Sequence, residues 1–264
     1  KNKVVSPQYY DSIVPYIDID IKGNALYKNR LMMLDLVANN NWKRPIFFSP
    51  GAFDDEDYLW MKDYLQLDGM VYKLVPVKTA IPKDGSPLDM GQIDSEKMYT
   101  NVMKWDWGNS DSDKIYHDIE TRRESITYRT NLARLMDQLI AERKFEKAKT
   151  IIDLAMTKLP LDKFGYYSLV EPFTKGYYQV GEKAKAQKLL EQLMAKYKDN
   201  LNYYSHLKSS EQSSLAVDII TDLERYRSLL QVMKENGDLN FYAKNRTVFN
   251  TYIQMFERFG REKE

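Results

Sequence analysis

"RTNLARLMDQLIAERKFEKAKTIIDLAMTKLP", residues 129 to 160, has the pattern of two helices joined by a short turn. Apolar residues recur at offsets of three and four, which places them on one face of a helix. They are Leu132, Leu135 and Leu139 in the first part and Ala148, Ile152 and Ala155 in the second. Phe145 follows the turn, and Pro160 ends the second helix because proline has no backbone N–H to donate. This stretch predicts a helix–turn–helix unit.

A second unit with the same pattern covers about residues 167 to 198. Its matching positions lie 38 residues further on, at Tyr177, Gly181, Ala186, Leu190 and Leu193. The pattern resembles the tetratricopeptide repeat, in which small residues such as Ala148 and Ala155 let neighbouring helices approach closely and whose usual period is about 34 residues. The sequence departs from that repeat at two positions, where Met136 replaces the small residue of the first helix and Arg143 replaces the turn glycine.

Two further amphipathic helices follow in the C-terminal part of the chain. Their apolar residues are Leu215, Ile219, Leu223, Tyr226, Leu230 and Met233, and then Val248, Tyr252, Met255 and Phe259. We therefore predict a helical, tetratricopeptide-like domain over residues 118–264. Such arrays bind a protein or peptide on their concave face, or they pack against their own chain. Capture of a carboxyl terminus is not expected, because Ala133 and Asp137 stand where Lys and Asn are needed.

The N-terminal part of the chain alternates between strand and helix patterns. "IVPYIDIDI", residues 13 to 21, has the period of a strand, and a helix with Tyr27, Leu31, Leu34 and Ala38 on one face follows. The next predicted elements are a strand at 46–48, a helix with Met61 and Leu65 buried that Gly69 ends, and a strand at 71–77. A short helix that Asp94 or Ser95 caps comes last. This order predicts a small parallel sheet of β-α-β-α-β type in an α/β domain over residues 1–117.

A parallel sheet would place candidate ligand-binding residues beyond the carboxyl ends of its strands. Asp20, Ser49 and the loop 78–93 would meet there, which is the basis for an alternative function as an enzyme acting on a sugar or nucleotide sugar. Asp18 and Asp20 share one face of the first predicted strand. They suit a general acid and base or a metal pair, although a solvated strand face explains them with fewer assumptions.

An acidic loop between the two predicted domains has partial calcium-loop spacing. Asn109, Asp111, Asp113 and Glu120 fall at positions 1, 3, 5 and 12, but Lys114 occupies the position of the required glycine. A flexible loop that caps the helix after Asp118 accounts for the same residues. Tyrosine pairs at 177–178 and 203–204 likewise allow two interpretations, either stacking on sugars or packing between helices.

Composition excludes several classes of function. The chain of 264 residues has a net charge of +1, so no basic field favours nucleic acid as a partner. It has no cysteine and only two histidines, which excludes thiol chemistry and leaves little material for a metal site. Neither a G-x-G-x-x-G nor a P-loop motif is present. We expect no cofactor.

Three phrases of the N-terminal part occur in the same order in a known family. "ANNNWKRPIFFS" (38–49), "DYLQLDGMVYKLVPVK" (63–78) and "MYTNVMKWDWGN" (98–109), with "YHD" at 116–118, resemble the soluble C-terminal region of bacterial multi-spanning membrane proteins similar to protein O-mannosyltransferases. The candidate binding residues in these phrases are Trp42, Arg44, Trp107, Asn109 and Asp118, in addition to Asp18 and Asp20. No catalytic residue of that glycosyltransferase-like family has a counterpart in this chain.

The resemblance implies that transmembrane helices precede Lys1 in the native protein. It also implies a location on the periplasmic side of a bacterial inner membrane, with the transmembrane part of the same protein as a partner. The expected function is a non-catalytic, extracytoplasmic accessory region of a glycosyltransferase-like membrane protein. Its helical array would recruit or orient an acceptor or partner protein.

Overall fold

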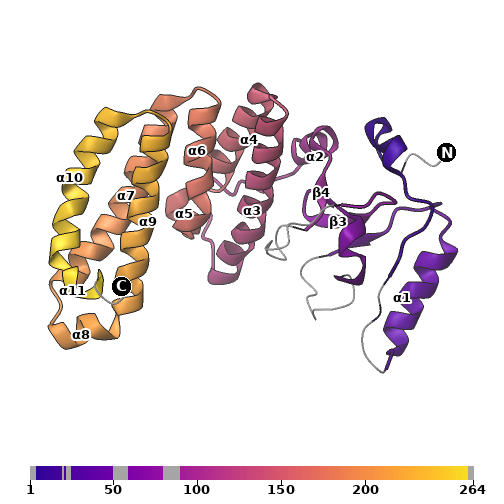
Figure 1. Cartoon of the computed structure of the whole chain (residues 1–264), viewed down its shortest axis with the longest axis horizontal. Coiled ribbons are helices and arrows are strands. Elements are labelled where there is room, and N and C mark those ends of the chain that lie inside the picture. The colour runs from indigo at the N-terminus through magenta and orange to yellow at the C-terminus, as the bar shows by residue number, and fades with distance from the viewer. Residues whose placement is uncertain (1–3, 20, 22–24, 50–58, 80–89, 261–264) are drawn as a thin grey trace. The chain divides into compact units, whose positions relative to one another are not determined.

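The structure, a computed structural model, describes residues 4–19, 21, 25–49, 59–79 and 90–260. The chain forms two compact units, Lys1–Trp107 and Gly108–Glu264 (Figure 1). Unit 1 contains a small sheet with helices, and unit 2 is an array of helices. The expected combination of an α/β part with an all-α part is therefore confirmed, and residues 108–117 group with the helices.

Unit 1 contains a four-stranded mixed sheet in the order β1-β3-β2-β4. β3 is antiparallel to both β1 and β2, while β2 and β4 are parallel. The elements of unit 1 are η1 (Pro7–Ser12), α1 (Lys28–Asn39), β1 (Phe47–Phe48), η2 (Leu59–Tyr64), β2 (Leu65–Asp68), β3 (Val71–Leu74), β4 (Gln92–Ile93) and α2 (Ser95–Val102).

The predicted parallel β-α-β-α-β topology is wrong, because residues 65–74 form an antiparallel hairpin. Leu65 and Leu67 of β2 are fully buried, and the offset of four from Met61 to Leu65 made this segment look like a helix. Gly69, expected to end that helix, instead forms the turn between β2 and β3 with φ +74°. A two-residue connection favours an antiparallel hairpin, whereas parallel strands need a longer crossover. The start of the expected helix, residues 54–58, lies outside the described residues.

The predicted strand over residues 13–21 is also wrong. Among the described residues of this range, Ile13 alone forms a β-bridge, with Val77, and the Val14 N–H donates to the Pro76 carbonyl at 2.9 Å. Pro15 and Pro76 lack the backbone N–H groups that would extend this pairing. Residues 14–19 therefore run as an irregular segment beside α1.

The N-terminal residues 4–9 are fastened to the sheet and to the start of α2. Lys73 of β3 is 4% exposed and donates from Nζ to the Val4 carbonyl at 2.5 Å. Burial, together with the neighbouring Lys97, lowers the pKa of Lys73 to about 8. The Ser6 hydroxyl donates to Asp94, the predicted cap, which also accepts from the Lys97 N–H at 3.3 Å. Polar contacts thus hold Val4 and Ser6 against the sheet and the start of α2.

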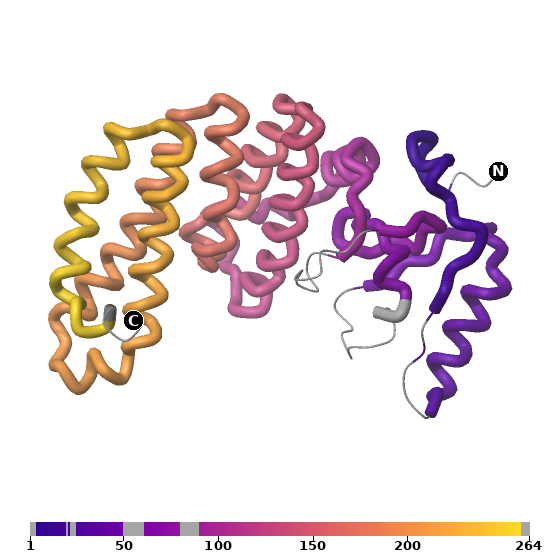
Figure 2. The backbone as a smooth tube through the Cα atoms, viewed as in Figure 1, coloured from indigo at the N-terminus to yellow at the C-terminus, as the bar shows by residue number. Residues whose placement is uncertain are grey.

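Unit 2 consists of helical hairpins that pack one after another (Figure 2). α3 packs on α4, α6 packs on α7, and α9 packs on α10, while α4–α6 and α7–α9 contacts join the hairpins. The helices are α3 (Ile119–Ala141), α4 (Phe145–Lys158), α5 (Leu161–Phe164), α6 (Glu171–Gln179), α7 (Lys183–Ser205), α8 (Ser209–Ser214), α9 (Ala216–Glu235), α10 (Leu239–Met255) and α11 (Glu257–Gly260), with η4 (Tyr167–Val170) before α6.

Most apolar faces predicted for these helices are confirmed. The residues assigned to the two helix–turn–helix units at 132, 135, 139, 148, 152 and 155, and at 177, 186, 190 and 193, are all buried. The helix α10 is an exception, because Val248 is half-buried and Met255 is 57% exposed. Phe249 and Phe256 are buried instead, and the Phe249 ring stacks on Tyr226 with centroids 5.1 Å apart. The predicted stripe was one residue out of register on either side of Tyr252.

The three hairpins share one turn geometry. Arg143, Gly181 and Gly237 each have positive φ, at 59°, 80° and 71°. The next N–H in each turn donates to a carbonyl five residues earlier, from Lys144 to Leu139, from Glu182 to Tyr177 and from Asp238 to Met233, at 2.8–2.9 Å. This is the Schellman helix end, in which glycine is the favoured residue. Arg143 therefore occupies a position where the other two hairpins have glycine.

A close approach between hairpins explains why Met136 is tolerated in place of a small residue. Gly176 of α6 lies against α3 and α4, and a Cβ atom there would come within 3.1 Å of Ile152 and even closer to the Met136 sulfur. The small residue missing from α3 is thus supplied by α6. The large side chain of Met136 thus fits against Gly176, which has no side chain.

Arg129 organises the connection between α4 and α6. It is fully buried, and its guanidinium donates to the carbonyls of Leu159 at 2.9 Å, Tyr166 at 3.4 Å and Gly165. Gly165 and Tyr166 both have positive φ, so this connection follows an unusual path. The four-residue helix α5 lies within it and accounts for the repeat spacing of 38 rather than about 34 residues.

Replacing Arg129 tests this role. We expect Arg129→Met to lower the free energy of unfolding of unit 2 by about 2–4 kcal/mol, because the buried Leu159 carbonyl and the partly buried Gly165 carbonyl lose the guanidinium that donates to them. Arg123→Met in the same helix is the control, since the Arg123 side chain is 64% exposed and pairs with Glu120 one turn away. Its effect should stay within about 0.5 kcal/mol. Urea unfolding followed by far-UV circular dichroism measures both, and equal effects would contradict the assigned role.

Candidate functional site

An apolar cleft in unit 1 lies between residues 14–19 and α1. Its volume is about 410 Å³, within the size range of small-molecule pockets. Among its lining residues only Tyr16, Asn41 and Trp42 have polar side-chain atoms, and none is charged. The lining is formed by Val14, Pro15, Tyr16, Ile17, Ile19, Leu34, Val37, Ala38, Asn41, Trp42 and Pro76. The cleft can hold an apolar group, but it has no group that would neutralise a phosphate or a carboxylate.

The turn after α1 places Trp42 in this cleft at the cost of backbone strain. Asn41 and Trp42 have φ values of 49° and 57°, which a bulky side chain rarely adopts. Asn40 holds the turn: its Nδ2 donates to the Arg44 carbonyl at 2.7 Å, and its Oδ1 accepts from the Arg44 N–H at 3.3 Å. Strained backbone that is held in this way is typical of functional sites.

An exposed apolar stripe of α1 continues from the cleft. No residue of α1 is buried, although the whole helix lies within the described chain. Tyr27 and Leu31, one turn apart, are 67% and 58% exposed, and the same stripe continues into the cleft through Leu34 and Ala38. The stripe predicted from sequence is therefore present. Leu34 and Ala38 line the cleft, whereas Tyr27 and Leu31 are exposed.

The other predicted strand-end residues do not form a site in the described part of the chain. Asp18 is exposed beside the cleft-lining residues Ile17 and Ile19. Asp20 and residues 80–89 of the predicted loop lie outside the described residues. Ser49 is exposed just after β1, and Arg44 is exposed in the turn. Because the sheet is not parallel, the premise that brought Asp20, Ser49 and the loop 78–93 together no longer holds.

Trp107 and Asn109 flank the boundary between the units. In unit 1 the rings of Trp105 and Trp107 meet edge to face, with centroids 5.6 Å apart. In unit 2 Asn109 is exposed and has φ 59°. Neither residue lines the cleft.

The acidic loop after Asn109 is bound to unit 2 through lysines. Lys158 Nζ contacts both carboxylate oxygens of Asp111 at 3.1 and 3.2 Å, and Lys163 Nζ contacts Asp113 at 2.7 Å. The Ser110 hydroxyl donates to the Lys158 carbonyl at 2.6 Å. Residues 110–113 thus form a strap across the end of α4 and α5, an arrangement that favours ion pairing over calcium ligation.

The remaining candidate residues of this loop belong to the start of α3. Asp118 caps α3, since its Oδ1 accepts from the Thr121 N–H at 2.7 Å, and this hydrogen bond lowers the pKa of Asp118. Glu120 pairs with Arg123 at 3.0 Å on the exposed side of the helix. Within the described ranges, no three His, Cys, Asp or Glu side chains gather to hold a metal ion. Within those same ranges, no helix is long and apolar enough to cross a membrane.

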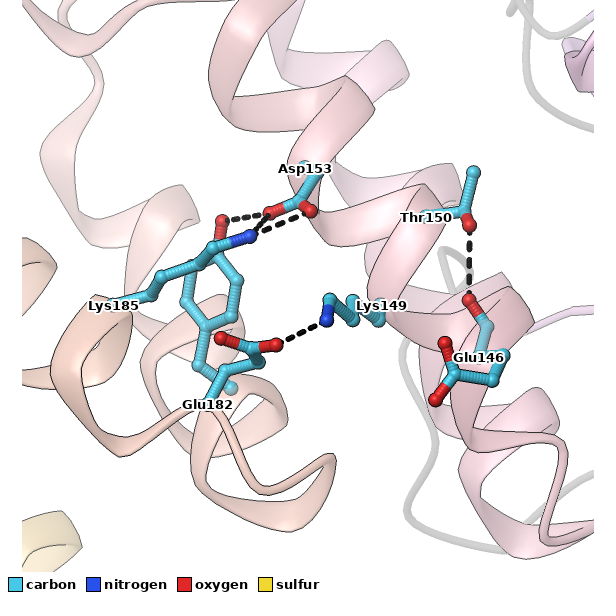
Figure 3. Close-up of polar contacts among 7 residues, drawn as sticks. Glu146, Lys149, Thr150, Asp153, Glu182 and Lys185 are labelled. Carbon is cyan, nitrogen blue, oxygen red and sulfur yellow. Dashed lines mark hydrogen bonds and ion pairs between the residues drawn. The ribbon is translucent and has the colours of Figure 1, made fainter.

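A polar junction joins the first two hairpins of unit 2 (Figure 3). Lys185 Nζ donates to both oxygens of Asp153 at 2.7 Å, and the Tyr177 hydroxyl donates to Asp153 at 2.8 Å. Lys149 pairs with Glu182 beside them. Burial raises the pKa of Tyr177, so its hydroxyl keeps its proton and remains a donor. Each lysine of this cluster is paired with a carboxylate, Lys185 with Asp153 and Lys149 with Glu182. The cluster therefore serves the packing of one hairpin on the other.

A more deeply buried junction joins α6 and α7 to the last hairpin. Asp238 is 3% exposed and accepts from the Tyr178 hydroxyl at 2.9 Å and from Gln187 Nε2 at 2.7 Å. Lys183 Nζ lies 3.0 Å from its other oxygen. The tyrosine pair 177–178 therefore serves helix packing, because each hydroxyl bonds a carboxylate of another hairpin.

Sequence reasoning identified Trp42 but missed most of the cleft. The strand pattern expected over residues 13–21 gives no sign that Val14 and Tyr16 line a cleft, and Val37 lies outside the stripe predicted for α1. Two signals pointed elsewhere: Pro15 interrupts the strand pattern, and α1 has apolar residues beyond its predicted stripe, at Met32 and Leu36.

Replacement of Asp238 should weaken unit 2 in a pH-dependent way. Burial alone would raise the pKa of Asp238, but hydrogen bonds from Lys183, Gln187 and Tyr178 outweigh it, so the pKa lies below the usual 3.8. The charged form then contributes stability that is complete above pH 3.8 and is lost as the pH falls further. We expect Asp238→Asn to cost about 2 kcal/mol at neutral pH, and the difference from the unchanged chain should shrink below about pH 4.

Asp153→Asn is the matched control for this prediction. The Asp153 side chain is 37% exposed, so solvent screens its ion pair and the expected cost at neutral pH is about 0.5 kcal/mol. The free energy of unfolding of all three proteins is measured by chemical unfolding at neutral pH. The measurement is repeated at pH 3 for the unchanged chain and for Asp238→Asn. A pH-independent difference for Asp238→Asn would contradict the assigned charge network.

Comparison with known families gives one match. Residues 1–97 match the family model described as TMEM260-associated domain 2. The matched range includes the sheet, α1 and the whole apolar cleft. No curated protein and no solved structure gives a significant match to the chain. The family match fits a region associated with a membrane protein.

Proposed function

We propose that this chain is a non-catalytic, extracytoplasmic accessory region of a glycosyltransferase-like membrane protein. In this proposal, unit 1 attaches to the membrane-embedded part of that protein, and the helical array of unit 2 recruits or orients an acceptor or partner protein. The observation that carries the proposal is the match of residues 1–97 to a TMEM260-associated domain. The resemblance of the phrases at 38–49, 63–78 and 98–109 to the soluble region of such membrane proteins also supports it.

The incomplete packing of unit 1 also supports attachment to another body. Tyr27 and Leu31 expose an apolar stripe of α1, and Tyr16 at the cleft is 68% exposed. Contiguous exposed apolar surface typically marks an interaction site. Attachment through unit 1 would leave the helices of unit 2 available to a second partner.

The tetratricopeptide-like character of unit 2 supports recruitment of a protein. Three hairpins end their first helix in the same way, at Arg143, Gly181 and Gly237. In arrays of this kind the first helices of successive hairpins form the binding surface, which here would involve α3 and α6. Asp137 of α3 and Lys175 of α6 are both exposed, and Lys175 acts electrostatically on Asp137. The surface formed by α3 and α6 therefore has a negative charge at Asp137 and a positive charge at Lys175. Such a surface suits a polar segment of a protein.

The glycosyltransferase part of the proposal rests on the resemblance alone. It assigns catalysis to a membrane-embedded part, and the periplasmic side of a bacterial inner membrane as the location of both units. Tyr16 supplies the hydroxyl among the residues that line the cleft, and no carboxylate, imidazole or amine is among them.

Photo-crosslinking in cells that make the native protein tests recruitment. A photoreactive amino acid is placed at Asp137 or Lys175, and, as a matched control, at Lys188, an exposed position on the second helix α7. We expect positions 137 and 175 to give the same crosslinked extracytoplasmic polypeptide, identified by mass spectrometry, and position 188 to give none.

Two outcomes would contradict recruitment by the array. Crosslinks from positions 137 and 175 only to the protein itself would mean that the array packs on its own chain. Equal crosslinking at all three positions would mean that α3 and α6 have no special surface.

A further inference from the structure

We infer that the cleft and the exposed stripe of α1 form a surface that binds an anionic lipid bilayer. This surface, here called the α1 surface, consists of Tyr16, Tyr27, Leu31, Trp42, Lys43 and Arg44. The inference rests on the proposed function in that unit 1 is placed next to a membrane, and it names lipid as a direct partner of unit 1.

The apolar component of the α1 surface has the residue types that enter a membrane interface. Leu31 and Tyr27 are more than half exposed, and Tyr16 and Trp42 stand at the cleft. Tyr and Trp favour the boundary between lipid headgroups and acyl chains, because their rings are apolar and their tips are polar. The cleft of about 410 Å³ adds a concave apolar surface that has no charged lining.

The charge around this apolar surface selects the kind of bilayer. Residues 25–48 contain four cations, Lys28, Arg30, Lys43 and Arg44, against the single carboxylate of Asp35, whereas the whole chain has a net charge of only +1. Lys28, Lys43 and Arg44 are exposed, and the Arg30 guanidinium lies 5.6 Å from the centre of the Tyr27 ring. Cations beside exposed apolar residues are complementary to anionic headgroups.

The turn that holds Trp42 fixes the geometry of this surface. Asn40 bonds the backbone of Arg44 on both sides, so Trp42 and the two cations that follow it are held at one end of the cleft. Such a turn keeps an aromatic anchor and its neighbouring charges together, which reduces the entropy lost on binding.

Vesicle binding by the full 264-residue chain tests the inference. The probes are vesicles of equal parts phosphatidylglycerol and phosphatidylcholine, compared with vesicles of phosphatidylcholine alone. We expect sedimentation with the anionic vesicles, and partitioning at least tenfold weaker for the neutral ones. Brominated acyl chains should quench tryptophan fluorescence, and Trp42→Phe should remove most of that quenching.

Four variants separate the contributions of charge and apolar contact. Removing two cations in Lys43→Ala/Arg44→Ala should weaken partitioning by about 30-fold. Leu31→Asp should weaken it by about tenfold, and because Leu31 is 58% exposed the fold should survive. Asp18→Asn removes an anion beside the cleft and should strengthen binding by about fivefold. Leu239→Asp is the control, since Leu239 is 60% exposed in unit 2, and it should have no effect.

The inference would be overturned if the chain bound neither kind of vesicle, or bound both equally well. It would also be overturned if Leu239→Asp weakened binding as much as Leu31→Asp. If the chain does not bind anionic vesicles but position 137 still gives the crosslinked polypeptide, the inferred lipid contact is wrong and recruitment by the array stands. Binding to anionic vesicles without that crosslinking would remove only recruitment by the array.

Discussion

The buried guanidinium of Arg129 is the interaction on which the arrangement of the helical unit depends. It donates to carbonyls at 159, 165 and 166, and so fixes the connection between the first two hairpins. Burial lowers its pKa to about 10, so it stays charged at neutral pH and its hydrogen bonds stay strong. With that connection fixed, α6 approaches closely enough for Gly176 to face Met136. The strap of Asp111 and Asp113 then binds lysines at the end of the same connection.

Unit 1 is packed less completely than unit 2. Its sheet is small, and its helix α1 has no buried residue. The β2–β3 hairpin supplies buried residues such as Leu65, Leu67 and Leu74, while α1 has none. A helix of 12 residues is marginal in water without tertiary contacts. Its apolar stripe is part of the α1 surface that we propose binds a membrane. The strained turn at Trp42 belongs to that surface.

Much of the helical unit could be predicted from sequence, because the repeat imposes the same spacing twice and burial follows that spacing. The α/β unit could not, since four-residue strands and short apolar runs fit helix and strand patterns equally well, as Met61 and Leu65 did. Trp42 was recognised as a candidate, but the cleft arises from Pro15 and Pro76 ending a strand pairing, a tertiary event that no local pattern specifies. Arg129 was missed for a similar reason: its acceptors are backbone carbonyls 30 or more residues away.

We propose that the chain works as an accessory region attached to a membrane protein. Immunoblotting of fractionated source cells, with an antibody raised against this chain, tests it most directly. We expect a band well above 31.1 kDa that stays in the membrane fraction after an alkaline carbonate wash. A band near 31.1 kDa that the wash releases would contradict it.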